Sequence, residues 1–258
     1  MHYPRVERET EQASATSSLM RGIEILRLLV EAGEPVSPTE LARQVGLHQS
    51  SVSRVLATLA AAGYVRKTTN RRFEPDFGVL TLAAAVTKFP LVRKPRAVIE
   101  DAAAAHPGVL ITLSILWRGQ ILYFLRAEGD QDIIDFWGAG FPLHQSAPGM
   151  RMLVSLPEDE ALTFLRSSRE RNGWPRADNV TPRDEAEALR RARNLLDHDI
   201  LILDGWHQRQ RFGAATLIDY PADYPVALSI SAERGRATDD QVRLWLHEIR
   251  RAVEKSLQ

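Results

Sequence analysis

The chain has 258 residues, and 33 lysines and arginines balance 33 aspartates and glutamates. This neutrality excludes a histone-like polycation and a long acidic tail, although it can hide local charge. The sequence contains no cysteine, which excludes disulfide frameworks, cysteine nucleophiles and thiolate metal sites. At roughly 100–200 residues per domain, the length favours two domains. Neither a secretory signal nor an apolar run of ~18 residues occurs, so we expect a cytoplasmic protein without membrane contact.

The first residues predict a tail followed by three helices and a hairpin. Residues 1–17 are polar and aperiodic, which is typical of a mobile tail. From Ser18, apolar residues recur at spacings of four, three and four, which predicts a helix with Leu19, Ile23, Leu26 and Val30 on its apolar face. Ser37-Pro38-Thr39-Glu40 is a capping box that opens a second helix, which ends at Gly46. A third helix ends at Gly63, and a two-stranded hairpin follows over residues 64–73.

The stretch 41–73 has an uneven charge. It contains six basic residues and no acidic one; the basic residues are Arg43, Arg54, Arg66, Lys67, Arg71 and Arg72. A local basic face is expected of nucleic-acid binding, because cations that neutralise phosphates release condensed counterions. A solvated face with lopsided charge would have the same composition, so charge alone leaves both interpretations open. The order of helices and hairpin favours DNA binding, since it is the order of a winged helix-turn-helix.

The winged helix-turn-helix suggests which residues contact DNA. Its third helix enters the major groove by its N-terminal residues, and the hairpin meets the backbone or the minor groove. Short hydroxyls and an amide at the front of a helix can reach base edges and phosphates. Helix capping is the alternative role for Ser50 and Ser51, and His48 could equally be a solvent-exposed residue at the helix start. The predicted DNA-binding residues are Arg21, Ser37, Thr39, His48, Gln49, Ser50, Ser51, Ser53, Arg54, Arg71 and Arg72.

The rest of the chain predicts a linker and then an α+β domain. A linker helix is predicted over residues 76–94, where Leu80, Leu82, Val86 and Phe89 offer an apolar contact surface. Strands are predicted at 109–117, 121–126, 133–137, 200–204, 214–218 and 226–231. Helices are predicted at 95–106, 148–167, 182–197 and 238–256. Mixed strands with flanking helices predict the α+β class.

Several segments resemble the IclR-type transcriptional regulators. SLMRGIEILRLLVEAGEPVSPTELARQVGLHQSSVSRVLATLAAAGYVRK, which is residues 18–67, looks like the DNA-binding domain of that family. PLHQSAPGM at 142–150 is similar to the stretch that opens its effector-domain helix, and ALSIS at 227–231 followed by RATDD is similar to its last strand and final helix. The resemblance implies a winged helix-turn-helix over 18–75, a linker helix over 76–94 used in dimerisation, and a GAF-like effector-binding domain over 95–258. It also implies homodimers or dimers of dimers on palindromic double-stranded DNA operators.

The resemblance also implies an effector site, carried over residue by residue. Its residues are Phe141, Ala147, Pro148, Gly149, Asp204, Phe212, Ser229 and Ser231. Free N–H groups at the helix opening and two hydroxyls on one strand face would receive a carboxylate. We therefore expect a small organic acid with an aromatic or other bulky apolar body, lying against the phenylalanines. The sequence departs from the family pattern at Met150-Arg151 and at Phe212. The alternatives are that the serines bond neighbouring backbone, and that Phe212 and Met150 fill the cavity.

Enzyme motifs are missing from the sequence. His198 lies between Asp197 and Asp199, but adjacent side chains point apart and no His-x₃-His spacing occurs, so no metal site is expected. No dinucleotide fingerprint, P-loop or Gly-x-Ser-x-Gly motif occurs, so we expect neither a cofactor nor catalysis. The competing function is a small-molecule-binding signalling module whose helix-turn-helix contacts proteins, and an enzyme ranks behind it. Salt-dependent binding to duplex DNA separates the first two functions, and turnover of a candidate acid would revive the third.

Overall fold

The chain forms two compact units, residues 1–88 and residues 89–258. The computed structural model describes residues 5–129, 141–176, 178, 180–221 and 224–258, with side chains from residue 18 onward. Within this described part, none of the helices combines the length and the hydrophobicity that a membrane span needs. The division between the units falls inside the predicted linker.

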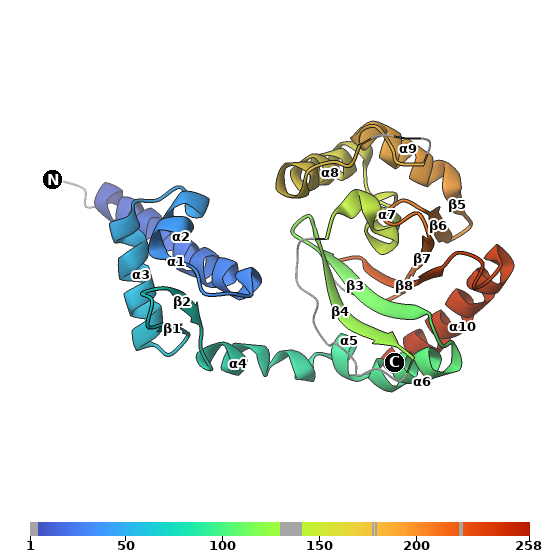
Figure 1. Cartoon of the computed structure of the whole chain (residues 1–258), viewed down its shortest axis with the longest axis horizontal. Helices are drawn as coiled ribbons and strands as arrows, with labels where there is room; N and C mark the ends of the chain where they lie inside the picture. The colour runs from blue at the N-terminus through green and yellow to red at the C-terminus, as the bar shows by residue number, and fades with distance from the viewer. Residues whose placement is uncertain (1–4, 130–140, 177, 179, 222–223) are drawn as a thin grey trace. The chain divides into compact units, whose positions relative to one another are not determined.

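The first unit combines three helices and a small hairpin with a fourth, short helix that follows the hairpin (Figure 1). Its elements are α1 (Arg5–Ala32), α2 (Pro38–Val45), α3 (Gln49–Ala61), β1 (Val65–Lys67), β2 (Phe73–Pro75), α4 (Gly78–Ala83) and a 3₁₀ turn (Val86–Lys88). The capping box is present, because the Ser37 hydroxyl accepts the Glu40 N–H and the Glu40 carboxylate accepts the Ser37 N–H. Gly46 ends α2 at a φ of 67°, a left-handed conformation that glycine adopts without strain.

The predicted first helix is present as α1, but its start and its buried side differ from what the sequence suggests. The helix begins at Arg5, so most of the predicted tail is helical. The domain core takes only part of the predicted apolar face: Leu26 packs against the core, Ile25 and Leu29 beside it are fully buried, and Ile23 and Val30 are 54 % and 48 % exposed. Apolar residues occur on more than one side of α1, so their spacing identifies a helix without deciding which side packs inward.

The predicted linker helix is interrupted. It consists of α4, the 3₁₀ turn and, in the second unit, α5 (Pro90–Arg93). Proline lacks an N–H and disfavours helical backbone in the preceding residue, which explains why Phe89 has an extended backbone. Leu80 and Leu82 of α4 are 61 % and 55 % exposed. The linker therefore presents apolar side chains that its own unit does not bury.

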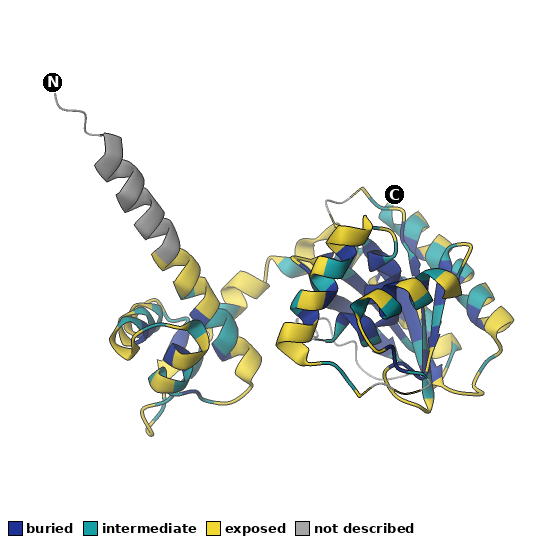
Figure 2. Ribbon diagram, turned by 90° about the horizontal axis from the view of Figure 1, so that it is seen from above, coloured by how far each residue is buried: buried dark blue, intermediate teal, exposed yellow. Residues whose placement is uncertain are grey.

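The second unit has the predicted α+β fold, built on an antiparallel six-stranded sheet of order β4-β3-β8-β7-β6-β5. The strands are β3 (Leu110–Trp117), β4 (Gln120–Glu128), β5 (Leu196–Asp197), β6 (Ile200–Asp204), β7 (Arg211–Leu217) and β8 (Val226–Glu233). One side carries a 3₁₀ turn (Leu143–Gln145), α7 (Ala147–Leu153), α8 (Glu158–Asn172) and α9 (Glu185–Leu195), and the other carries α6 (Arg96–Ala105) and α10 (Asp239–Leu257) (Figure 1). Figure 2 shows the buried positions gathered in the sheet and on the helix faces that cover it.

Most of the predicted strands and helices of this unit are confirmed. The strand predicted at 133–137 lies outside the described residues. The helix predicted over 148–167 is divided into α7 and α8, because Pro157 caps the second of them. The two-residue strand β5 was not predicted, since so short a segment carries no periodic signal.

Candidate DNA-contact surface and effector pocket

The front of α3 is an exposed polar surface. Gln49, Ser50, Ser53 and Arg54 are exposed, and Ser51 is half-buried. His48 is the N-cap residue, and its side chain makes no capping hydrogen bond. Neither Ser50 nor Ser51 therefore has the capping role that the sequence left open. Their hydroxyls can bond to a partner outside the domain.

Arg72, one of the predicted DNA contacts, forms hydrogen bonds within its own unit. Its Nε donates to the Pro35 carbonyl at 2.8 Å, and its Nη2 donates to Glu40 Oε2 at 2.8 Å. The hydrogen bond from the Ser37 N–H, supported by the Arg72 charge, lowers the pKa of the Glu40 carboxyl. Arg72 thus joins the hairpin to the start of α2. The Ser37 hydroxyl is likewise engaged as the helix cap.

The remaining cations of the stretch 41–73 differ in availability. Arg66 forms an ion pair with Glu74 across the hairpin at 2.8 Å. Arg43, Arg54 and Arg71 are exposed and form no ion pair with any described residue. Arg71 lies in the hairpin turn at a φ of 59°, a left-handed conformation that is costly for a residue with a Cβ. Arg21 and Thr39, also predicted as DNA contacts, are exposed on α1 and α2.

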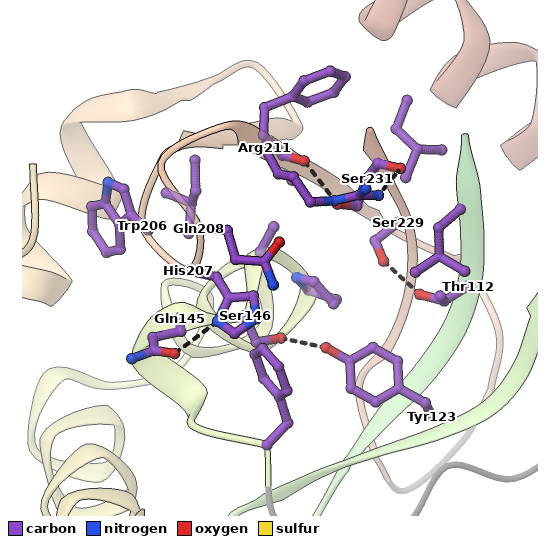
Figure 3. A pocket seen from close by; sticks show the side chains of 18 of the residues that line it. Thr112, Tyr123, Gln145, Ser146, Trp206, His207, Gln208, Arg211, Ser229 and Ser231 are labelled. Carbon is purple, nitrogen blue, oxygen red and sulfur yellow. Dashed lines mark hydrogen bonds between the residues drawn. The ribbon is translucent and has the colours of Figure 1, made fainter. Parts of the chain in front are cut away.

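A cavity of about 340 Å³ lies between the α7 side of the sheet and the residues around the start of α7 (Figure 3). Its floor follows the register of the strands. One row contains Leu203, Gly213, Ser231, Leu110 and Glu128, and the next contains Ser229, Thr112 and Arg126. Its other walls include Gln145, Ser146, Trp206 and His207. The cavity has the size and mixed lining of a small-molecule site.

Six of the eight predicted effector residues line this cavity: Phe141, Ala147, Pro148, Phe212, Ser229 and Ser231. Asp204 does not, because it lies at the end of β6 and forms an ion pair with Arg234 at 2.5 Å. Gly149 does not either, since it is buried within α7. Met150 is fully buried and lies outside the lining, so it does not fill the cavity.

The opening of α7 presents fewer free N–H groups than the sequence predicts, because the N–H groups of Gly149 and Met150 are bonded within the described residues. Ser146 caps the helix by accepting the Gly149 N–H at 3.0 Å, and its carbonyl accepts the Met150 N–H at 2.8 Å. Pro148 has no N–H to donate. The Ser146 hydroxyl also lies 2.9 Å from the Tyr123 hydroxyl, and burial raises the pKa of Tyr123 to about 12. The phenol is therefore neutral at physiological pH.

The two predicted serines have protein partners. Ser231 donates to the Phe212 carbonyl at 2.9 Å, which is the backbone bond that the sequence left open as an alternative. The Ser229 and Thr112 hydroxyls lie 2.6 Å apart (Figure 3). Two hydroxyls that share one hydrogen bond retain a second donor hydrogen. The Ser229–Thr112 pair can therefore still donate to a ligand.

Phe212 is oriented differently from the prediction. Side chains alternate between the two faces of a strand, so Arg211 and Gly213 face the cavity and the Phe212 ring faces the opposite side. On that side, Phe212 lines a second cavity together with Val242 of α10. The sequence suggested that the apolar body of the ligand lies against the Phe212 ring. The orientation of this ring excludes that contact. Trp206 lines both cavities.

Several polar residues that line the cavity were not predicted from the sequence. Arg211 Nη2 donates to the Ser231 carbonyl at 3.4 Å (Figure 3). His207 Nδ1 lies 2.9 Å from Gln145 Oε1, and burial, together with the Arg211 charge, lowers the pKa of His207. The imidazole is thus neutral near pH 7. The one available signal in the sequence was the position of Arg211 at the start of an apolar strand.

Comparisons with known proteins support the resemblance. The family model of the IclR helix-turn-helix domain matches residues 18–69. The chain is 24 % identical to the transcriptional repressor IclR of Escherichia coli and 25 % identical to the acetate operon repressor of Salmonella typhimurium, each alignment covering 87 % of this chain and 83 % of the relative. An IclR family transcriptional regulator from Brucella abortus has the same fold, with a TM-score of 0.74 at 20 % identity over 93 % of this chain and 90 % of that one. So does an IclR homolog from Microbacterium hydrocarbonoxydans complexed with 4-hydroxybenzoate, with a TM-score of 0.69 at 19 % identity over 93 % and 98 %.

Proposed function

Because the chain belongs to the IclR family of transcriptional regulators, we propose that it binds a palindromic DNA operator and responds to a small organic acid. The observation that carries the DNA-binding part is the exposed start of α3, whose hydroxyls and amide have no capping role. The cavity of the second unit carries the ligand-binding part. The two features lie in separate units, which is the arrangement of a sensor joined to a DNA reader.

DNA recognition combines the front of α3 with the tip of the hairpin. Gln49 and Ser50 face base edges, whereas Arg54, one turn further along, neutralises a phosphate. Arg71 at the hairpin turn contacts the backbone or the minor groove. A strained backbone that presents an exposed cation supports a functional role for this residue.

The operator is palindromic because the protein binds it as a homodimer or a dimer of dimers. A single recognition helix reads only ~3–5 base pairs, so two copies must bind adjacent half-sites. The exposed apolar residues of α1 and α4 supply the contact; they are Leu19, Ile23, Val30, Leu80 and Leu82. Apolar side chains at four- and three-residue spacings along α1 are also the pattern of a helix–helix seam.

The effector is an organic acid whose carboxylate meets Arg211. This guanidinium is the cation that β7 places on the cavity face, and its bond to the Ser231 carbonyl is long, at 3.4 Å. Guanidinium–carboxylate pairs are short and charge-assisted, and Arg can hold both oxygens. The apolar body lies against Phe141, Pro148 and Trp206. The 4-hydroxybenzoate bound by the Microbacterium homolog of the same fold supports an aromatic body.

Titration of a fluorescent duplex, selected from a random pool by the wild-type chain, tests the DNA-binding part. Arg54→Ala and Arg71→Ala should each weaken binding and reduce the logarithmic salt slope by about 1. Arg166→Ala, which removes an exposed arginine from α8, is the matched control and should leave both quantities unchanged. Unchanged affinity and slope in both test variants would refute the proposed docking. Failure to select any duplex would favour the signalling module instead.

A further inference from the structure

Two charged side chains of the cavity lining, Arg211 and Glu128, lie toward opposite ends of its floor. Arg211 reaches the Ser231 carbonyl on β8, and Glu128 lies at the end of the edge strand β4. Ser231 is in register with Leu110 on β3, which is in register with Glu128. Glu128 is therefore two strands from the carbonyl that Arg211 contacts, or roughly 10 Å at about 4.8 Å per strand.

None of the described residues pairs with the carboxylate of Glu128. It is half-buried, lines the cavity, and forms no hydrogen bond or ion pair with another described residue. Arg126 is on the same face of β4, two residues earlier, and belongs to the neighbouring row with Thr112 and Ser229. An ionised carboxylate can only accept hydrogen bonds, so a ligand end that enters this part of the cavity must donate one.

Resting on the proposed acid effector, we infer that Glu128 selects acids that carry a hydroxyl or amino group at the end opposite the carboxylate. The distance of two strands between Glu128 and the carbonyl that Arg211 contacts is larger than the distance between the ammonium and carboxylate groups of an α-amino acid. It suits groups on opposite ends of one ring or of a short chain. Arg211 then holds the carboxylate and Glu128 accepts from the distal donor.

Glu128 acts by rejection as much as by attraction. A ligand with an apolar distal end would desolvate the carboxylate without giving it a partner, which is costly for a charged group. A second carboxylate at that end would in addition repel it. Sites that bond a substrate hydroxyl reject analogues lacking it more strongly than apolar pockets discriminate by size.

Calorimetry with three probes tests this selection: 4-hydroxybenzoate, benzoate and terephthalate, which carries a carboxylate in place of the hydroxyl. The wild-type protein should bind 4-hydroxybenzoate at least tenfold more tightly than either of the others. In Glu128→Gln, which keeps the side-chain shape, the preference over terephthalate should fall at least tenfold, because the amide can donate to the second carboxylate. Glu248→Gln, on the exposed side of α10, is the matched control and should retain the wild-type preferences.

The outcomes separate this inference from the proposed function. Equal binding of benzoate and 4-hydroxybenzoate by the wild type, or an unchanged preference in Glu128→Gln, would overturn the role of Glu128 while leaving an acid effector in place. If the wild type binds terephthalate more tightly than 4-hydroxybenzoate, the distal group of the ligand is bound by Arg126. This result would also overturn the role of Glu128. If none of the three acids binds a protein that still binds its selected duplex, the acid effector itself is refuted.

Discussion

Replacing Arg211 tests where the carboxylate of the effector lies. Arg211→Met removes the charge and the donors but keeps a long apolar side chain on the pocket face of β7. A charge-assisted hydrogen bond contributes about 1.5–3 kcal/mol, and each 1.4 kcal/mol is about tenfold in affinity. Arg211 is only half-buried, so solvent screening favours the lower end of that range. We expect affinity for 4-hydroxybenzoate to fall about tenfold to thirtyfold.

The assay is isothermal titration calorimetry with 4-hydroxybenzoate and its neutral analogue 4-hydroxybenzamide. The loss should be confined to the acid, because the amide offers no charge for Arg211 to pair with. Arg211→Lys keeps the charge without the planar fork and should show an intermediate loss. The bond that Arg211 gives up in the free protein is long, so the melting temperature should change little. Equal losses for the acid and the amide, or no loss in Arg211→Met, would refute the placement.

Three further predictions concern stability and assembly. Burial lowers the pKa of His144 to about 4 from 6.5, and neither ring nitrogen has a partner among the described residues, so its contribution to stability is lost as the pH falls from about 6.5 toward 4. His144→Phe should raise the melting temperature and flatten its decline between pH 7.5 and 5; an unaltered decline would contradict this. A methyl group added by Gly78→Ala would lie 2.3 Å from the Gly63 carbonyl oxygen, so the start of α4 must shift and the melting temperature should fall, which a thermal scan checks. Ile23→Glu, at a position 54 % exposed, should give a folded protein that sediments as a monomer; a persistent dimer would exclude α1 from the contact.

Local chemistry made much of the fold predictable. The capping box at Ser37 and the left-handed glycine at position 46 fix the bounds of α2 through bonds between near neighbours in the sequence. The strands of the second unit follow apolar runs of adequate length. What remained undetermined was which side of α1 packs inward, since Ile23 and Ile25 have the same hydrophobicity and only the fold separates them.

The candidate sites were less predictable because side-chain partners come from distant segments. Arg72 appeared to be one more cation of a basic stretch, and its bonds to Pro35 and Glu40 depend on how the hairpin folds back. The sequence did not show that the Ser146 hydroxyl accepts the Gly149 N–H at the start of α7. Arg211 and Glu128 belong to no short motif, and only strand register brings them to one cavity.

Side chains alternate between the two faces of each strand, so the residues that shape the cavity are separate from the residues that pack against the helices. On β3, Leu110 and Thr112 face the cavity, whereas Ile111 and Leu113 are fully buried against the other side. A change at every second position can therefore alter the shape and polarity of the cavity without touching the packing against α6 and α10. Ligand preference and folding can diverge independently on the same eight-residue strand. The Brucella abortus regulator, which is 20 % identical to this chain, has the same fold.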